Sequence, residues 1–237
     1  MRWVLLLTAL CIVTSVRCTP SSREYYALRH GQSLANVQGV ISSDPRVACR
    51  EHGLSEAGWE QAAAAAREIC NEATRRGYDG VAIVSSDFRR ASQTAEAVLA
   101  GCAASGVRTW PRGVEWEVDL RERWFGELNG QSDARYADCW AEDSLDASHR
   151  CFGCEAVASV RARAAAVVRA LERHADLSEG RWMVVLVAHG DVLQILQTAF
   201  AGVDPRAHRS LDHLQTATLR PLRLVARPGV DSMENVC

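Results

Sequence analysis

The sequence predicts an α/β fold in which helices cover both faces of a mostly parallel sheet. From residue 25 onward, short apolar runs alternate with longer helix-like stretches, the pattern of strands joined by crossover helices. The run at residues 183–188 is apolar without interruption, which is typical of a central strand buried on both faces. We therefore expect a three-layer α/β/α sandwich.

Five stretches have the composition of strands. They lie, in chain order, at residues 25–28, 81–85, 113–120, 183–188 and 216–225. Pro221 interrupts the last of them, and proline cannot donate a hydrogen bond to a neighbouring strand. We therefore expect that strand near an edge of the sheet.

Helices are expected between these strands. Residues 31–36 can open one directly after the first strand. A long helix is expected to begin after Ser55, a good N-cap, and to end at Gly77, because glycine readily takes the left-handed conformation that ends helices. Another long amphipathic helix is expected at residues 155–175, with its arginines on a solvated face.

Two aspartates that follow predicted strands are expected to cap the next helix. Asp87 would begin a helix that continues to Leu99, and Asp191 would cap a helix over residues 192–201. An aspartate side chain at this position accepts a hydrogen bond from the unpaired amides of the first turn. Both predictions place polar residues at the carboxyl ends of strands.

Residues 131–153 are polar with scattered aromatic residues. This stretch is too short to form a hydrophobic core of its own. We therefore interpret it as a lid-like excursion within a single domain that spans residues 19–237.

Composition excludes several classes of function. The formal net charge of −2 gives no reason to expect nucleic acid or an anionic membrane as a partner. All 27 basic residues are arginine, so P-loop lysines and Schiff-base lysines are excluded. Every fixed cationic contact must therefore come from arginine.

Residues 1–18 have the features of a secretory signal. Arg2 supplies the positive charge, an apolar stretch follows at residues 4–16, and Val16 and Cys18 are acceptably small for a cleavage site. The sequence therefore predicts the secretory pathway or the extracellular space. An uncleaved signal anchor, which would tether the protein to a membrane, is the alternative.

Seven cysteines follow the predicted signal. In an oxidising compartment some of them would pair, and an odd number leaves at least one thiol unpaired. Cys151 and Cys154 form a CxxC motif near His149, which hints at a metal. One such motif without a second pair is weak evidence for zinc, so we favour a disulfide or inert thiols there.

Reactive side chains follow several of the predicted strands. His30 follows the first strand directly, beside Arg29 and Gly31, and His189 follows the fourth. Arg90 and Glu122 follow the second and third strands. Because ligands of open α/β sheets bind at the carboxyl ends of strands, we expect these side chains to meet at one anion site. Each residue alone also has an ordinary structural interpretation, as a hydrogen-bonded loop or surface residue.

Five motifs, in the same order along the chain, resemble the histidine phosphatase superfamily in its phosphoglycerate-mutase-like branch. Residues 29–36 (RHGQSLAN) resemble its RHGxSxxN signature, and residues 53–58 (GLSEAG) its second helix start. Residues 85–95 resemble the segment that carries the family's phosphate-binding arginine. Residues 120–123 resemble the segment that carries its catalytic acid, and residues 188–190 resemble the segment that carries its second histidine.

The resemblance implies a phosphomonoester hydrolase with no cofactor and no metal. His30 would attack phosphorus and become phosphohistidine, while Glu122 would protonate the leaving oxygen and later help to deprotonate a water. The charge on the phosphoryl oxygens would be stabilised by Arg29, Arg90 and His189, with Asn36 as a weaker candidate.

The resemblance leaves a mutase as the alternative to a phosphatase. The glycolytic mutases usually carry asparagine after the second His-Gly, where this chain has Asp191, and a tryptophan-rich segment where it has residues 37–45. Ser33 and Ala35 do not fit the RHGxRxP motif of the secreted acid phosphatases either. We therefore favour a phosphatase. A non-catalytic member that binds phosphorylated ligands is a further alternative.

The expected partner is a small phosphorylated substrate, without nucleic acid and without a membrane once the signal is cleaved. The sequence does not indicate an oligomeric state. Contacts beyond the phosphate are expected from the excursion at residues 131–153, and the candidates are Arg135, Trp140, His149 and Arg150.

Overall fold

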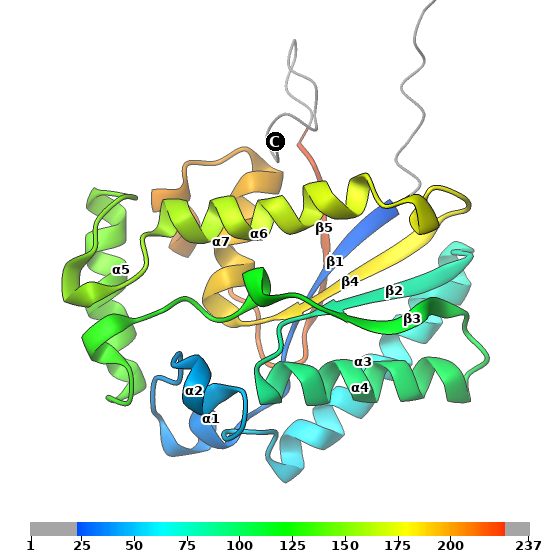
Figure 1. The fold of residues 1–237 in the computed structure, drawn as a ribbon, viewed down its shortest axis with the longest axis horizontal. Helices are drawn as coiled ribbons and strands as arrows, with labels where there is room; N and C mark the ends of the chain where they lie inside the picture. Colours follow the sequence, from blue (N-terminus) through cyan, green and yellow to red (C-terminus); the bar gives the residue numbers. More distant parts are fainter. Residues whose placement is uncertain (1–22, 226–237) are drawn as a thin grey trace, which may run out of the picture.

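The computed structural model describes residues 23–225 of the chain. The predicted signal at residues 1–18 lies outside the described residues, as does Cys237. A five-stranded mixed sheet forms the middle of the molecule, with strand order β3-β2-β4-β1-β5 (Figure 1). Its strands are β1 (Arg23–Arg29), β2 (Gly80–Ser85), β3 (Thr109–Trp116), β4 (Trp182–Ala188) and β5 (Leu219–Leu222).

The α-helices connect these strands and cover the sheet. They are α1 (Leu34–Gln38), α2 (Pro45–Ala48), α3 (Glu56–Arg76), α4 (Arg89–Ala104), α5 (Tyr136–Leu145), α6 (Val157–Glu172) and α7 (Gly190–Ala201). Short 3-10 turns lie at η1 (Val118–Leu120), η2 (Gly126–Leu128), η3 (Asp133–Arg135), η4 (Cys151–Gly153), η5 (Ala175–Leu177) and η6 (Pro205–Ser210). Among the described residues, no helix has the length and apolar character needed to cross a membrane.

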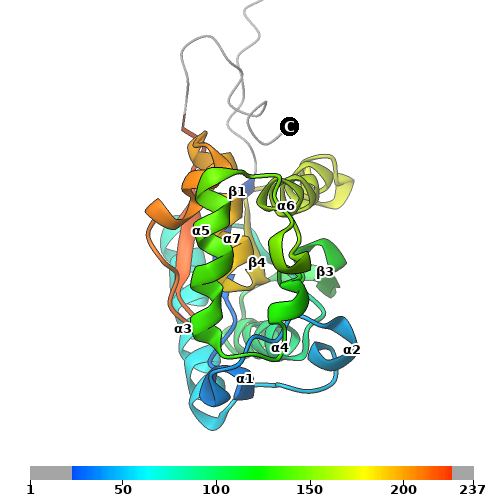
Figure 2. The same cartoon turned by 90° about the vertical axis from the view of Figure 1, so that its left-hand side faces the viewer.

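The sheet separates two hydrophobic cores, because alternate residues of a strand point to opposite faces. Along β1, Tyr25 and Ala27 pack with helices α6 and α7, whereas Tyr26 and Leu28 pack with α3 and α4. Figures 1 and 2 show these two helix pairs on opposite sides of the sheet. The expected three-layer α/β/α sandwich is therefore confirmed.

The sheet is mostly parallel, as expected. Strands β1, β4, β2 and β3 run parallel to their neighbours, and β5 pairs antiparallel with β1 at the edge. Pro221 lies within β5 and pairs with Tyr26. The edge position predicted from this proline is therefore confirmed.

The boundaries of helix α3 agree with those predicted from sequence. Ser55 caps its amino end, with Oγ accepting a hydrogen bond from the amide of Gly58. Gly77 ends the helix at a φ of 66°, in the left-handed region where glycine is favoured. Local capping chemistry was sufficient to place both ends.

Both predicted aspartate caps are wrong. Asp87 leaves the amino end of α4 without a side-chain cap and instead pairs with Arg121. Helix α7 starts at Gly190 with His189 as its N-cap, so Asp191 lies inside the first turn. The carboxylate of Asp191 accepts a hydrogen bond from Trp140 Nε1 at 2.9 Å and lies 3.4 Å from Arg123 Nη1. Both aspartates therefore contact side chains from other segments of the chain.

Several predicted boundaries shift by a few residues. The strand expected at residues 216–225 is the shorter β5, and the helix expected to end at Leu99 is α4, which ends at Ala104. The strand expected at residues 113–120 is β3, which ends at Trp116, and the 3-10 turn η1 follows it. The helix expected from residue 31 begins at Leu34, after a capping box between Ser33 and Asn36. The helix expected at residues 155–175 is the shorter α6.

Candidate active site

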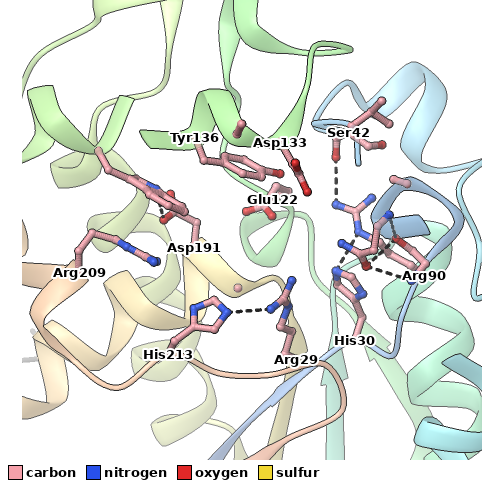
Figure 3. A pocket seen from close by; sticks show the side chains of 17 residues that line it. Arg29, His30, Ser42, Arg90, Glu122, Asp133, Tyr136, Asp191, Arg209 and His213 are labelled. Carbon is pink, nitrogen blue, oxygen red and sulfur yellow. Dashed lines mark hydrogen bonds between the residues drawn. The ribbon is translucent and has the colours of Figure 1, made fainter. Parts of the chain in front are cut away.

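A cavity of about 360 Å³ lies where the carboxyl ends of the parallel strands meet the excursion at residues 131–153 (Figure 3). Arg29 is the last residue of β1, and Arg90 lies in the first turn of α4 after β2. His30 and Glu122 complete this end of the cavity wall. The expected meeting of these side chains at one site is what the structure shows.

His30 is held in one tautomer. Its Nδ1 lies 2.7 Å from the carbonyl oxygen of Gly31, which can only accept, so Nδ1 carries the proton. Its Nε2 faces Arg90 Nε at 3.0 Å and is therefore the nitrogen with the lone pair. Burial and the positive charges of Arg90 and Arg29 hold the pKa of His30 well below its usual range. The imidazole is thus neutral and nucleophilic at physiological pH.

Gly31 is required by a close approach of two chain segments. A Cβ atom at this position would lie 2.5 Å from the carbonyl oxygen of Gly58 in α3. The tight contact with α3 is the constraint that the structure shows at this position. This contact fixes the backbone that carries His30.

Arg90 and Arg29 place two guanidinium groups at the His30 end of the cavity. Arg90 is buried, donates from Nη2 to the carbonyl oxygen of Ser42 at 3.0 Å, and finds no partner for Nη1 within residues 23–225. Arg29 donates from Nη1 to Leu214 O at 2.9 Å and to His213 Nε2 at 3.1 Å, while its buried Nε has no partner in the same part of the chain. Buried donors without a partner are costly, so these groups are prepared for an anion.

Glu122 is a buried carboxyl group whose pKa is raised to about 7. Burial is the main cause, and it outweighs the opposing charge of Arg90. One carboxyl oxygen accepts the backbone amide of Arg123 at 3.0 Å. The group can therefore carry a proton near neutral pH, as a general acid must.

His189 lies beside His30 but does not line the cavity. The centroids of the two rings are 5.2 Å apart, and His189 Nε2 lies 3.0 Å from Ser86 Oγ. Its buried Nδ1 has no partner among the described residues. Asn36 does line the cavity, although its Oδ1 already accepts hydrogen bonds from Ser33 N and Oγ at 3.0 and 2.9 Å.

The far end of the cavity is built by helix α5 and the chain around η6. The Tyr136 and Trp140 rings are stacked with centroids 5.4 Å apart, and Arg209 Cζ lies 3.7 Å from the centroid of the Trp140 ring. His213 lines the same region (Figure 3). The sequence analysis missed Tyr136, Arg209 and His213, because no motif marks them.

Of the four candidates for contacts in the excursion, Trp140 lines the cavity. His149 points instead to Asp143, with Nε2 2.6 Å from Oδ1. Arg135 pairs with Asp138 on the surface, and Arg150 is exposed. The helical turn of α5 decides which of these side chains face the cavity, and the sequence alone gave no helix there.

A network of buried ionic groups lies behind Glu122, and we call it the ion network. Arg123 is fully buried and donates to both oxygens of Asp143 at 2.7 Å each. Arg123 Nη1 also lies 3.4 Å from Asp191, whose other oxygen accepts Trp140 Nε1 at 2.9 Å. Burial by itself raises the pKa of Asp191, but the neighbouring imidazole of His208 and the positive charge of Arg123 lower it to about 2.

The six cysteines among the described residues are all free thiols. Cys151 is exposed, whereas Cys154 is buried and its Sγ donates to Phe125 O at 3.2 Å. Of the two expectations for the CxxC motif, a disulfide or inert thiols, the structure shows free thiols. Cys139, Asp143 and His149 place possible metal ligands within 4.8 Å of one another. Both oxygens of Asp143 are already bound by a guanidinium, whose charge opposes a cation there.

The fold and the site together define an α/β protein with a buried neutral imidazole and two guanidinium groups at the carboxyl ends of its parallel strands. The chain matches the family model of the histidine phosphatase superfamily (branch 1) over residues 25–228, and it belongs to that superfamily. The comparison with curated proteins gives no match.

Solved structures show the same fold. A mycobacterial glucosyl-3-phosphoglycerate phosphatase with VO3 is 29% identical, with 83% of this chain and 90% of that chain covered and a TM-score of 0.64. The complex of that phosphatase with inorganic phosphate is 28% identical, with 83% of this chain and 87% of that chain covered and a TM-score of 0.63. A mutant phosphoserine phosphatase from Entamoeba histolytica with phosphoserine is 19% identical, with 83% of this chain and 88% of that chain covered and a TM-score of 0.61. At this low identity the likeness shows the shared fold alone. Family and neighbours together support a phosphatase.

Proposed function

We propose that the protein is a metal-independent phosphomonoester hydrolase that works through a phosphohistidine on His30. The observation that carries this proposal is the single tautomer of His30. Its Nδ1 proton is held by a backbone carbonyl, and its Nε2 lone pair is aimed at Arg90 in the cavity. A neutral imidazole presented to a guanidinium is the arrangement that in-line attack on a phosphoryl group needs.

Substrate binding releases the nucleophile. In the structure, the Arg90 Nε–H donates to the lone pair of His30 Nε2. A phosphate oxygen is a stronger acceptor than imidazole, so it takes this hydrogen bond and leaves the lone pair directed at phosphorus. The unpartnered Arg90 Nη1 and Arg29 Nε supply further donors to the phosphoryl oxygens. His189, beside His30, is proposed to contribute its unpartnered Nδ1, and Asn36 its amide.

The first chemical step forms a bond between His30 Nε2 and phosphorus and breaks the phosphorus–oxygen ester bond. Glu122 gives its proton to the leaving oxygen, so the product is a neutral alcohol. In the second step a water attacks phosphorus, its proton passes to Glu122, and inorganic phosphate leaves with His30 restored. The raised pKa of Glu122 suits both roles, because the group can hold or accept a proton near pH 7.

The cavity favours a small phosphorylated substrate. Its volume is about 360 Å³, which lies at the lower end of the range for small-molecule sites. The glucosyl-3-phosphoglycerate phosphatase that it resembles is named for a phosphorylated metabolite, and its structure is known with inorganic phosphate. This likeness supports a metabolite substrate over a phosphoprotein.

The covalent intermediate is tested directly. The full chain is mixed with a substrate labelled on phosphorus and quenched in alkali, because phosphohistidine is labile in acid. We expect label on the protein for the wild type and none for His30→Ala, together with a loss of at least about 10⁴-fold in turnover. His174→Ala, a histidine outside the cavity, is the matched control. Equal turnover by wild type and His30→Ala would overturn the proposal.

Two further readouts separate the alternatives. Release of inorganic phosphate identifies a phosphatase, whereas conversion of one phosphoglycerate isomer into another without release identifies a mutase. Binding of phosphorylated ligands with neither reaction identifies the non-catalytic alternative. Activity that persists in a strong chelator supports the metal-independent route, and loss of activity that added metal restores would contradict it.

We also propose that the chain enters the secretory pathway. The support is the charge, apolar length and small residues of segment 1–18. Fusion of residues 1–22 to a reporter tests this, with Arg2→Glu and a charged substitution in the apolar stretch as disabling variants. A reporter that stays in the cytoplasm would contradict the proposal, and one that remains membrane-bound would indicate the signal-anchor alternative.

A further inference from the structure

Two buried cysteines face each other between helices α3 and α4, on the side of the sheet away from α6 and α7. Cys70 Sγ and Cys102 Sγ are 3.7 Å apart, although 32 residues separate them in the chain. Cys70 is 5% exposed and Cys102 is fully buried. Both belong to the hydrophobic core between the sheet and these two helices. Neither takes part in the cavity or the ion network.

The two helices are held at this spacing by their own packing. A Cβ atom added at Gly101, next to Cys102, would lie 2.7 Å from the Cβ atom of Ala66, one turn before Cys70. Small residues therefore allow the helices to touch, and the two sulfurs meet in the gap between them. Bonded sulfurs lie about 2.05 Å apart, so the two side chains must rotate toward each other to bring the sulfurs within bonding distance.

We propose that Cys70 and Cys102 form a disulfide bond that links α3 to α4 when the chain folds under oxidising conditions. The sequence indicated that some cysteines pair, but it gave no connectivity. The structure assigns this pair because its sulfurs are adjacent, buried and on rigid elements. The proposal does not depend on the phosphatase activity.

The bond forms by exchange with a small-molecule or protein disulfide, such as oxidised glutathione. The thiolate of one cysteine attacks a sulfur of that disulfide, forms a mixed disulfide and releases one thiolate. The second cysteine then attacks the mixed disulfide and releases the other thiolate. Two cysteine thiols are oxidised and one external disulfide is reduced to two thiols. Because both sites are buried in the folded protein, the exchange takes place during folding.

The link joins the two helices that support the His30 end of the cavity. At the amino end of α3, Ser55 Oγ and Gln61 Oε1 hydrogen-bond the backbone of Gln32, two residues after His30. Helix α4 carries Arg90 in its first turn. A covalent link between α3 and α4 therefore keeps the nucleophile and its guanidinium on one rigid unit.

Peptide mapping tests the bond. The full chain is unfolded with reductant, refolded in a glutathione redox buffer, denatured without reductant and alkylated. Trypsin then yields Cys70 in residues 68–75 and Cys102 in residues 91–108, each as the only cysteine of its peptide. We expect the two peptides to be joined and lighter than the separate thiol peptides by the mass of two hydrogens. Recovery of both as alkylated single peptides from folded protein would overturn the proposal.

Thermal unfolding gives a second readout. We expect reduction to lower the melting temperature of the oxidised wild type by roughly 10 °C, because the bond closes a loop in the unfolded chain. The variant Cys70→Ala/Cys102→Ala should lose this response to reductant, whereas Cys49→Ser should keep it in full. A wild type that melts at the same temperature with and without reductant would also contradict the bond.

Discussion

Two groups of buried charges lie side by side in this protein, and they differ in whether the protein itself satisfies them. At the His30 end of the cavity, Arg90 and Arg29 retain donors without partners, and burial raises the pKa of Glu122. In the ion network, Arg123 binds both oxygens of Asp143, and its charge is neutralised within the fold.

The division runs between residues that are neighbours in the chain. Glu122 belongs to the cavity, and Arg123 belongs to the ion network. At the His30 end of the cavity, guanidinium donors keep no partner among the described residues, whereas in the ion network the guanidinium and the carboxylate bind each other. Burial of a charge therefore does not by itself indicate the role of that charge, because its partners decide the role.

The largest expected effect lies in the ion network. Asp143→Asn removes the carboxylate that neutralises Arg123 and leaves a buried cation, so we expect the free energy of unfolding to fall by about 3–5 kcal/mol. Urea unfolding measures the change. Asp133→Asn, an exposed substitution at the cavity mouth, is the matched control. A loss no larger than that of the control would show that the ion network contributes little to stability.

The sequence predicted the fold and the His30 end of the cavity better than it predicted the far end of the cavity and the ion network. Strand periodicity and the caps of α3 are local properties, and the residues at strand ends converge because parallel strands share one edge. The sequence alone therefore predicts one shared site for Arg29, His30, Arg90 and Glu122. The roles of these residues in catalysis stay proposals.

The far end of the cavity and the ion network could not be predicted. Arg209 and His213 come from irregular chain after α7, where no period or motif exists. The ion network joins segments far apart in the sequence, and pairing at long range is not visible in local patterns. The wrong caps at Asp87 and Asp191 have this cause, since each aspartate is taken by an arginine from another segment.

The next prediction concerns the guanidinium donors at the His30 end of the cavity. Arg90→Met keeps most of the side-chain volume and removes the charge, so we expect kcat/KM to fall by about 10²–10³-fold. In contrast to Asp143→Asn, this variant should not lose stability, because the wild-type guanidinium is buried and incompletely satisfied. Arg89→Met, the exposed neighbour, is the matched control for both measurements.

Inorganic phosphate provides a direct check on the same residue. At a concentration 100 times its Kd, phosphate should stabilise the wild type by about 2.7 kcal/mol, since it binds only the folded state. At the same concentration Arg90→Met should gain far less. An equal gain in both proteins would show that Arg90 does not bind the anion, and it would weaken the contrast between the two charge groups.

The last prediction concerns the response of Glu122 to pH. Its pKa is about 7 in the folded protein, above the ordinary value of 4.5, so between these values the folded state binds more protons than the unfolded state. Stability contributed by the protonated carboxyl is therefore present below about pH 4.5 and is lost as the pH rises through 7. Glu122→Gln cannot ionise and escapes this loss, which approaches about 3 kcal/mol above pH 8.

We expect Glu122→Gln and the wild type to differ little in stability at pH 5, and the variant to be the more stable protein at pH 8, although it has lost its general acid. Urea unfolding at both pH values measures the difference, with Glu127→Gln as an exposed control. Activity should show the same titration, because the wild type loses its proton donor as the pH rises through 7. A stability difference that does not change with pH would mean that Glu122 is already ionised in the free protein. The proton would then have to be acquired with the substrate, whose phosphate charge would raise the pKa of the carboxyl only on binding.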